Sequence, residues 1–337
     1  MKIIRILLFP FAILYGIITG FRNLFFDIGI FKSYTFELPI ICVGNLNVGG
    51  TGKTPQIEYL TRLLSDKYKV AILSRGYKRE SKGFVLANEN ADAKILGDEP
   101  YQFYSKFKNI QVAVDTDRKN GIEKLLSLSN KPEIILLDDA FQHRKVKAGL
   151  NILLTTCNDL FCNDFILPTG NLRESRSGAD RANIIIVTKC PKSLSLENQN
   201  LIKKKLNLNK KQQLYFSFID YDDKIYSEKE SVNISEISEK NKLLIAGIAN
   251  PSSFFEFLKS EKDLVLEFPD HHNFSEKDLL EIKSFSKDRI VITTEKDYVR
   301  LKNSNFNDLF YLPIKSLFLN NSKIFDVTIL EFISKYV

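Results

Sequence analysis

The chain has 337 residues, which exceeds the roughly 250 at which a single hydrophobic core usually stops growing, so we expect two domains. Hydrophobic residues account for 44% and charged residues for 26% of the sequence, and these proportions exclude a disordered or a fibrous protein. The formal net charge of +7 favours anionic partners but is too small to indicate nucleic acid, and we expect none as a partner.

The first expected element is an apolar helix near the N-terminus. The segment Ile6–Phe21 is almost uninterrupted in its hydrophobicity and is flanked by Arg5 and Arg22. A helix of that length reaches only about 24 Å, short of the ~30 Å hydrocarbon core of a bilayer. We therefore expect residues 1–30 to form a helix that lies in a membrane interface, with its basic residues near anionic headgroups. A buried core helix is the alternative, because periodicity alone cannot separate the two, and a signal peptide is disfavoured by the lack of a small-residue cleavage site.

The two sides of this expected helix differ in composition. Its small or polar side consists of Arg5, Ala12, Gly16, Thr19 and Asn23, and its large apolar side of Leu7, Phe11, Leu14, Ile18, Phe21 and Phe25.

From Pro39 onwards, short apolar runs alternate with amphipathic helical patterns, which indicates a mostly parallel sheet covered on both faces. The first set of expected strands is Ile40–Val43, Val70–Leu73, Ile110–Val114, Ile134–Leu137, Ile152–Thr155, Ile184–Val187 and Leu214–Ser217. The second set is Leu243–Ile248, Leu264–Phe268, Ile290–Thr294 and Phe310–Leu312. We expect a first α/β domain over residues 31–218, a linker or β hairpin over 219–242, and a smaller C-terminal α/β domain over 243–337.

The strongest motif is a glycine-rich loop between the first expected strand and a helical pattern, which is the context of a P-loop. Backbone N–H groups of such a loop converge on phosphate oxygens, and the helix N-terminus adds a favourable dipole. Lys53 would reach the terminal phosphates and the Thr54 hydroxyl would hold Mg²⁺. The first glycine of the usual pattern is replaced by Asn47, which tolerates left-handed backbone. We expect the nucleotide to be bound by Asn47, Val48, Gly49, Gly50, Thr51, Gly52, Lys53 and Thr54.

Acidic and histidine residues supply the remaining candidates. The expected strand Ile134–Leu137 ends in Asp138 and Asp139, and a strand-end carboxylate in a P-loop fold orders Mg²⁺ directly or through water. A kinase also needs a group that accepts the proton of the acceptor hydroxyl, and an Asp close to a His suits that role. Each of the three histidines, His143, His271 and His272, lies close in sequence to an Asp, and Asp98, in the turn Gly97-Asp98-Glu99-Pro100, is a further acid. From spacing alone these residues would more often be surface turns than parts of a site. The sequence thus predicts a P-loop NTPase-type α/β/α sandwich with a phosphotransfer site.

Taken together, the motifs resemble those of the tetraacyldisaccharide 4′-kinase (lipid A 4′-kinase) family, and they cover nearly the whole chain. They are the P-loop Asn45–Pro55, Ser74-Arg75-Gly76-Tyr77, Gly97-Asp98-Glu99-Pro100, Asp138-Asp139-Ala140-Phe141-Gln142-His143-Arg144, Gly170-Asn171-Leu172-Arg173-Glu174, Asp270-His271 and Thr294-Glu295-Lys296-Asp297. The run that begins at Asp138 is the most specific, because P-loop kinases in general have no reason to carry it.

The resemblance implies a reaction and a place in the cell. The γ-phosphate of ATP, with Mg²⁺, would pass to the 4′-hydroxyl of an acylated glucosamine disaccharide 1-phosphate, giving lipid IVA in lipopolysaccharide synthesis. The protein would lie peripherally on the cytoplasmic face of a bacterial inner membrane, with no obligate protein partner.

The resemblance also implies roles for individual residues. Asp98 matches the general base and His271 its partner from the C-terminal domain, while Lys53, Asp138 and Asp139 match the groups that act on phosphate and Mg²⁺. Acceptor-binding positions are implied for Tyr77, Arg118, His143, Asn171, Arg173 and Glu174.

Two other classes of protein remain to be weighed. A membrane-associated partitioning ATPase has a similar loop but carries a lysine where Val48 stands, and without that lysine the contact across its ATP-bound dimer is lost. A GTPase is suggested by Thr188-Lys189-Cys190-Pro191, yet Pro191 replaces the Asp that would bind guanine. Neither class accounts for Asp98 or for the run from Asp138 to Arg144.

Overall fold

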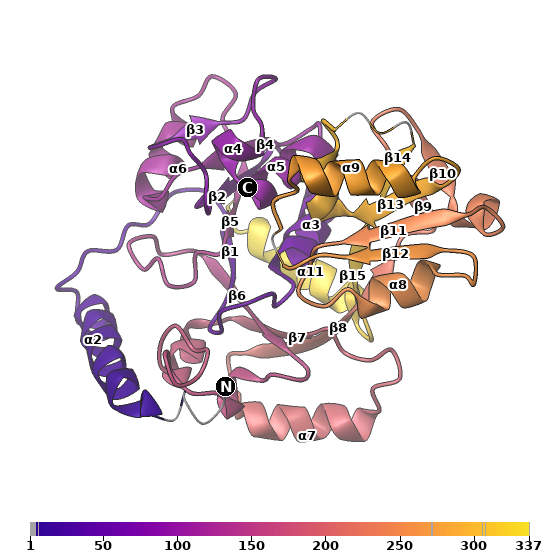
Figure 1. The fold of residues 1–337 in the computed structure, drawn as a ribbon. Helices are drawn as coiled ribbons and strands as arrows, with labels where there is room; N and C mark the ends of the chain where they lie inside the picture. The colour runs from indigo at the N-terminus through magenta and orange to yellow at the C-terminus, as the bar shows by residue number, and fades with distance from the viewer. Residues whose placement is uncertain (1–4, 6, 271, 305, 307, 337) are drawn as a thin grey trace.

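The computed structural model describes residues 5, 7–270, 272–304, 306 and 308–336, and the following statements refer to that part of the chain. Its strands form two sheets. The larger has nine strands in the order β15-β8-β7-β6-β1-β5-β2-β4-β3, and the smaller has six in the order β10-β9-β14-β13-β11-β12. Figure 1 shows the second sheet beside the first, with both covered by helices. The expected α/β class, a P-loop NTPase-type sandwich with a mostly parallel sheet, is confirmed.

The large sheet is parallel over its whole centre. Its strands are β1 (Ile40–Asn45), β2 (Val70–Ser74), β3 (Val85–Leu86), β4 (Gln111–Val114), β5 (Ile134–Asp138), β6 (Leu150–Thr156), β7 (Ile184–Thr188), β8 (Gln213–Tyr221) and β15 (Ile314–Phe318). Only the edge strands β3 and β15 pair antiparallel with their neighbours. Because parallel strands all end at the same edge, the residues that follow β1, β5 and β7 are brought close together.

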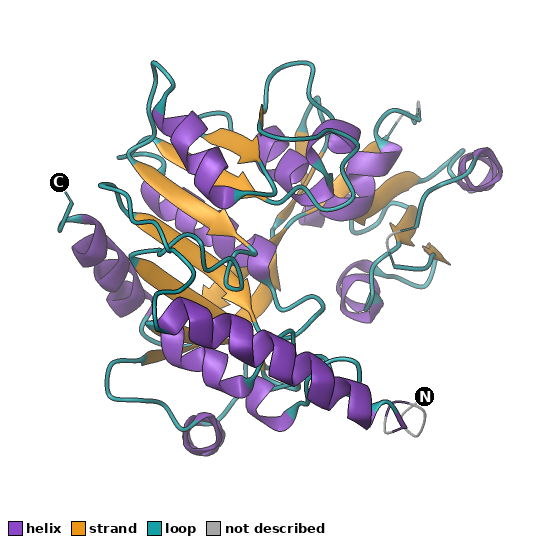
Figure 2. Ribbon diagram, turned by 90° about the vertical axis from the view of Figure 1, so that its left-hand side faces the viewer, coloured by secondary structure: helices purple, strands orange, loops and turns teal. Residues whose placement is uncertain are grey.

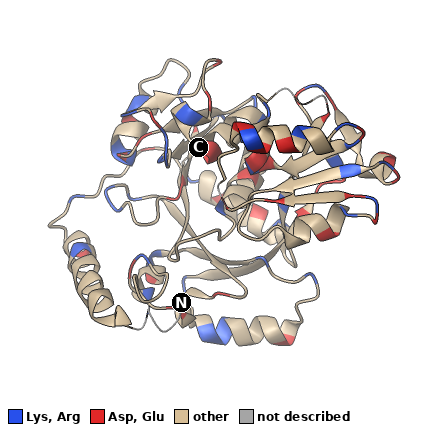
Figure 3. Ribbon diagram, in the orientation of Figure 1, with Lys and Arg blue, Asp and Glu red and all other residues tan. Residues whose placement is uncertain are grey.

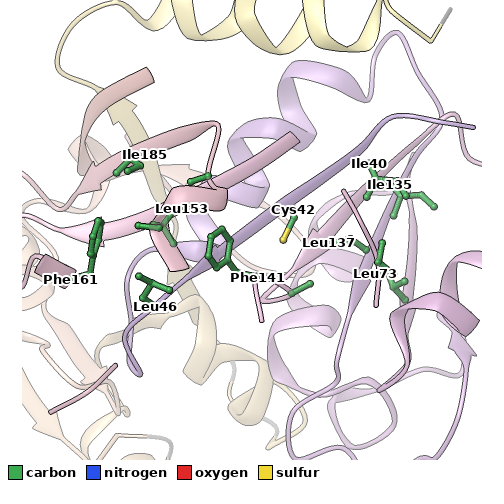
Figure 4. Close-up of a cluster of buried hydrophobic side chains, with 14 of the residues drawn as sticks. Ile40, Cys42, Leu46, Leu73, Ile135, Leu137, Phe141, Leu153, Phe161 and Ile185 are labelled. Carbon is green, nitrogen blue, oxygen red and sulfur yellow. The ribbon is translucent and has the colours of Figure 1, made fainter. Parts of the chain in front are cut away.

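Two hydrophobic cores lie on the two faces of this sheet, because successive residues of a strand point to opposite sides. Ile40 and Cys42 face one core and Ile41 and Val43 the other. Figure 4 shows the first core, in which Phe141 lies beside the strand that carries Cys42. The helices that cover the faces are α3 (Lys53–Leu64), α4 (Ala93–Leu96), α5 (Asp98–Lys106), α6 (Arg118–Leu126) and α7 (Leu196–Leu206). Between β6 and β7 the chain also forms two short 3₁₀ helices, η1 (Phe161–Asn163) and η2 (Arg176–Arg181).

The smaller sheet begins where a linker or hairpin is expected. Its strands are β9 (Lys224–Tyr226), β10 (Ser231–Asn233), β11 (Lys242–Ala246), β12 (Leu264–Glu267), β13 (Ile290–Thr294) and β14 (Leu309–Leu312). Of these, β9 and β10 form an antiparallel pair, and the other four run parallel. Its helical segments are η3 (Ile234–Ile237), α8 (Ser252–Leu258), α9 (Glu276–Phe285) and α10 (Glu295–Leu301).

The end of the chain returns to the large sheet. Strand β15 pairs with β8, and the helix α11 (Ser322–Ile333) places Phe325 and Ile329 in the core that also contains Ile57 of α3. The domain boundaries stay a prediction, but β15 and α11 belong to the segment 243–337 by sequence and to the large sheet by packing. The antiparallel strand β15 has no counterpart among the strands expected from the sequence, and it follows β14 after a single residue.

The N-terminal helix α2 (Phe9–Asp27) lies along the outside of the molecule, as Figures 1 and 2 show. Its small and polar side faces the protein: Ala12 is buried, and the Asn23 side chain donates to Glu174 Oε2 over 2.7 Å. Its apolar side is exposed, with Phe11, Ile18 and Phe21 each more than half accessible. Among the described residues, α2 is the helix whose length and composition would allow it to cross a membrane. The division into two sides is therefore as expected, whereas the helix runs six residues further than the apolar segment.

The packing of α11 can be tested by removing its largest buried side chain. Phe325 is fully buried and contacts the rings of Tyr59, Tyr215 and Phe318. Phe325→Ala should lower the free energy of unfolding by about 3–5 kcal/mol, because a cavity replaces the ring. Urea unfolding measures this, and Val327→Ala, an exposed position on the same helix, should change it by less than about 0.5 kcal/mol. A loss below ~1 kcal/mol for Phe325→Ala would show that α11 is not part of the main core.

Candidate active site

The loop between β1 and α3 has the backbone geometry that a phosphate-binding turn requires. Gly49 and Gly52 have φ angles of 111° and 88°, where L side chains are strained, and Gly52 forms the N-cap of α3. Asn47 does not use the left-handed conformation expected for it. Its side chain instead donates to Asp164 Oδ2 over 3.0 Å, so the asparagine ties the loop to the segment that follows β6. The asparagine that stands in place of the usual glycine therefore makes a side-chain contact and does not adopt a left-handed turn.

Lys53, the first residue of α3, lies between two acceptors. Its Nζ is 3.4 Å from Asn45 Oδ1 at the end of β1 and 3.6 Å from Asp139 Oδ1 after β5. The ammonium is mostly buried, with 11% of the side chain exposed. Thr54 is buried beside it at the start of the helix. An anion bound at this helix N-terminus would therefore meet a positioned cation and the helix dipole together.

Asp138 ends β5 and is buried. Its Oδ2 accepts a hydrogen bond from the Ser74 hydroxyl over 2.9 Å, and its Oδ1 has no hydrogen-bond partner within the described part of the chain. Burial, together with the charges of Glu99 and Asp139, raises the pKa of Asp138 to about 7. A carboxylate that is desolvated, crowded by like charges and lacking one partner is suited to a hard cation. The residues present therefore fit Mg²⁺.

Asp139 has the opposite electrostatic environment. Although burial acts against ionisation, Lys53 and Arg173 together lower the pKa of Asp139, and Arg173 binds its Oδ1 over 2.8 Å. Its backbone is left-handed, with a φ of 48°, which is uncommon for a residue other than glycine and turns the side chain toward the loop. The two adjacent acids thus differ: Asp139 is already paired with cations, while Asp138 is not.

The segment Asn171–Glu174 passes between the phosphate loop and α2. The backbone N–H of Val48 donates to the Asn171 carbonyl over 2.8 Å, and Glu174 is buried and accepts from Arg181 over 2.7 Å. On the other side, the Tyr15 hydroxyl donates to the Arg173 carbonyl over 3.0 Å. The structure therefore brings the expected acceptor-binding residues of this segment against both the loop and the N-terminal helix.

The other expected acceptor residues are placed less uniformly. Arg118 is fully buried, and its guanidinium donates to the carbonyl groups of Asp115 and Asp138 over 2.9 and 3.2 Å. Arg118 thus binds the backbone at the end of β5. Burial and the nearby Arg118 charge lower the pKa of His143 to about 4, so that imidazole is neutral at physiological pH. Tyr77 lies 72% exposed in the turn after β2.

Asp98 is the first residue of α5, at the contact between the two sheets' helices. Its carboxylate is paired with the guanidinium of Arg300 on α10, which also donates to the His272 carbonyl over 3.2 Å. His271, the expected partner of Asp98, lies outside the described residues. Arg300 was not expected from the sequence, although it lies on the helix that begins in Thr294-Glu295-Lys296-Asp297, three residues beyond that motif. Ser74 likewise had no role assigned, although it opens the motif Ser74-Arg75-Gly76-Tyr77 and stands at the end of β2.

The raised pKa of Asp138 predicts how stability depends on pH. The folded protein keeps a proton on this carboxyl that the unfolded chain has lost between about pH 4 and pH 7. Stability should therefore fall as pH rises through that range, by up to ~1.4 kcal/mol per pH unit for the one proton. Asp138→Asn should remove this component, measured as the change in unfolding free energy between pH 5 and pH 7 without nucleotide.

The control for this experiment is the exposed Asp180→Asn, which should leave the pH dependence of stability as it is in the original chain. An identical slope in the Asp138→Asn variant would show that Asp138 is ionised in the folded protein at pH 5.

Comparison with known proteins gives a consistent result. The family model described as tetraacyldisaccharide-1-P 4′-kinase matches residues 4–333. Tetraacyldisaccharide 4′-kinase of Flavobacterium psychrophilum is 65% identical over 336 residues, covering 99% of this chain and 98% of the relative, and that of Flavobacterium johnsoniae is 62% identical over 336 residues, covering 99% of each. The crystal structure of LpxK from Aquifex aeolicus in complex with ATP matches with a TM-score of 0.79 and 31% identity, covering 98% of this chain and 99% of that one. The chain therefore belongs to the tetraacyldisaccharide 4′-kinase family.

Proposed function

We propose that this chain transfers the terminal phosphoryl group of ATP to the 4′-hydroxyl of a tetraacylated glucosamine disaccharide 1-phosphate, and that the residues assembled at the end of the large sheet carry the reaction. The observation that carries this proposal is the meeting of Lys53, Asp139 and the start of α5 in one place. Lys53 and Asp139 are 3.6 Å apart, and Glu99, next to Asp98, is close enough to raise the pKa of Asp138. A phosphate site and a candidate base therefore share one electrostatic environment.

The phosphate loop supports the first part of this function. The loop that ends at Gly52 leads directly into the N-terminus of α3, where a triphosphate would gain from the helix dipole and from Lys53. Mg²⁺, held by Asp138 and Thr54, would neutralise charge on the phosphate oxygens. Asp139 would keep Lys53 oriented, since a cation with a fixed neighbour loses less conformational freedom on binding its ligand.

Asp98 supports the second part. As a general base it would accept the proton of the sugar hydroxyl while that oxygen attacks the phosphorus atom. Its pairing with Arg300 holds the carboxylate in a defined orientation and links it to the smaller sheet through α10.

The acceptor is expected on the side of the site that faces α2. Arg173 lies beside Asp139, and Asn171 accepts from the Arg5 guanidinium over 3.0 Å. These side chains offer the hydrogen-bonding groups that sugar hydroxyls and a phosphate require. The helix α2 that contacts this segment has an exposed apolar side, and Figure 3 shows that it carries few charged residues. A lipid whose acyl chains remain in the bilayer could present its sugar here, which supports a peripheral position on the cytoplasmic face of an inner membrane.

The role of Asp98 is tested by Asp98→Ala. Turnover should fall by ~10²–10⁴-fold because the general base is lost, while the dissociation constant for Mg-ATP should change by less than about twofold. Transfer of labelled phosphate to the disaccharide 1-phosphate in detergent measures the first quantity, and calorimetry measures the second. The exposed Asp66→Ala is the matched control and should keep full turnover. Turnover within about threefold of the original chain for Asp98→Ala would refute the assignment.

The membrane role of α2 is tested by placing charge on its exposed side. The double variant Leu14→Glu with Ile18→Glu changes two residues that are 57% and 59% exposed, so the fold should be kept. Binding to vesicles that contain anionic lipid should fall by at least about tenfold, because burying a carboxylate in the interface is costly and two large apolar side chains are lost.

The matched control is Ile324→Glu with Val327→Glu on α11, two exposed apolar residues of a different helix. Co-sedimentation with vesicles measures both pairs. Equal vesicle binding by the α2 double variant and the original chain would rule out this side as the membrane contact.

A further inference from the structure

The end of β7 carries a lysine that the reaction described above does not use. Lys189 follows Thr188 directly and has a φ of 55°, in the left-handed region. Lys78, Asp139, Asn207 and Asn321 share that conformation. Asparagine adopts it more readily than other non-glycine residues, and Asn207 stands at the C-terminus of α7, where it is common. Lys189 has neither of these reasons. A non-glycine residue in this conformation costs on the order of 1 kcal/mol, and such strain is retained where the surrounding structure fixes it.

Thr188 fixes the end of β7 to the phosphate loop. Its hydroxyl donates to the Thr51 carbonyl over 2.7 Å and lies 3.2 Å from the Thr155 carbonyl at the end of β6. The threonine is buried, and a Cβ added to Gly52 would meet it at 3.7 Å. The loop and the end of β7 are therefore held together as one unit, with Lys189 at its edge.

The ammonium of Lys189 lies over the phosphate loop. A Cβ added to Gly50 would be 3.8 Å from Lys189 Nζ. Packing around the side chain and the charge of Lys296, on α10 of the smaller sheet, both lower the pKa of Lys189, while Asp159 acts in the opposite direction. The two ammonium groups thus repel each other, although Lys296 also lies 3.4 Å from Glu99, and an anion bound beside Lys189 would relieve that repulsion.

The sheet order indicates which part of the nucleotide lies there. Strand β1 has β5 on one side and β6 and then β7 on the other. Asp138, Asp139 and the helix that begins at Asp98 are all on the β5 side, so the phosphoryl group that is transferred must face that way. The nucleoside half then extends from the loop toward β6 and β7, where Lys189 stands.

We propose that Lys189 is a nucleotide-binding residue that contacts the nucleoside half of ATP, at the α-phosphate and ribose, while Lys53 holds the terminal phosphates. This inference rests on the placement of the triphosphate proposed above. Pro191 stands where an Asp would be needed to bind guanine, so Lys189 provides affinity without selecting the base. Its loss should accordingly weaken ATP and GTP to the same degree.

The test is a calorimetric titration of the full-length protein with Mg-ATP and with Mg-GTP. Lys189→Ala should raise both dissociation constants by about tenfold, equivalent to ~1.4 kcal/mol. Lys189→Asn should behave in the same way, and it guards against misfolding because asparagine tolerates the left-handed backbone. Lys192→Ala is the matched control: it removes an exposed lysine three residues away, paired with Asp220, and should change affinity by less than about twofold.

Kinetics provide a second readout. Because Lys189 would bind the part of ATP that does not react, its loss should raise KM for ATP about tenfold and leave kcat within about threefold. A lysine that only supported the loop would lower kcat as well, and that result would overturn the proposal. Without nucleotide, the unfolding temperatures of Lys189→Ala and Lys192→Ala should stay close to that of the original chain, and that of Lys189→Asn should be equal or higher, because asparagine tolerates the left-handed backbone.

Lys53→Ala separates the failure of this inference from the failure of the phosphate site. If Lys53→Ala loses nucleotide binding while Lys189→Ala keeps the original affinity, the role of Lys189 is refuted and the proposed function stands. If both variants keep the original affinity, the placement of the triphosphate is refuted, and the role of Lys189 with it.

Discussion

The ion pair between Lys53 and Asp139, the residue that follows β5, is the interaction on which the rest of the site depends. Lys53 and Arg173 both pair with this carboxylate, and the pairing offsets part of the cost of partly burying the three charges. Asp138 is left out of this pairing and has a raised pKa. A cation bound beside Asp138 would stabilise its charged form. The metal and the phosphate would therefore bind to neighbouring charged groups of opposite sign.

A second buried charge cluster joins the two sheets. Lys106, at the end of α5, lies 2.6 Å from both Glu58 of α3 and Glu295 of α10. Burial and the charge of Glu58 raise the pKa of Glu295 to about 7, although Lys106 acts against that change. Because α3 carries the phosphate-loop lysine and α5 carries Asp98, this cluster sets the spacing of the two functional helices. With the Asp98–Arg300 pair, it attaches α5 at both ends to the smaller sheet.

The N-terminal helix α2 contacts the site with one side and is exposed on the other. Its inner side contributes Arg5, Tyr15 and Asn23 to contacts with Asn171–Glu174, while its outer side is apolar and exposed. A helix that binds only the membrane would not need the inner contacts, and a core helix would not leave the outer side exposed. Under the proposed function, the two sides together would bring an acceptor with acyl chains to the phosphate site.

The sequence by itself determined the local elements and predicted the phosphate site. The glycines of the loop and the apolar runs of β1 and β5 could be interpreted from the sequence, because their local structure is determined by interactions within a few residues. The resemblance to one family pointed to Asp98 and to Asn171–Glu174, which spacing alone would have left as surface turns.

Tertiary structure alone decided which distant residues meet. The pairing of Arg300 with Asp98, the place of Lys189 over Gly50 and the return of β15 and α11 to the large sheet all join segments far apart in the chain. A charged residue on a short helix or after a strand could pair with many distant residues. The sequence around it does not indicate which of those residues it contacts. Only the packing of the two sheets, which fixes the relative positions of α5, α10 and the end of β7, selects one.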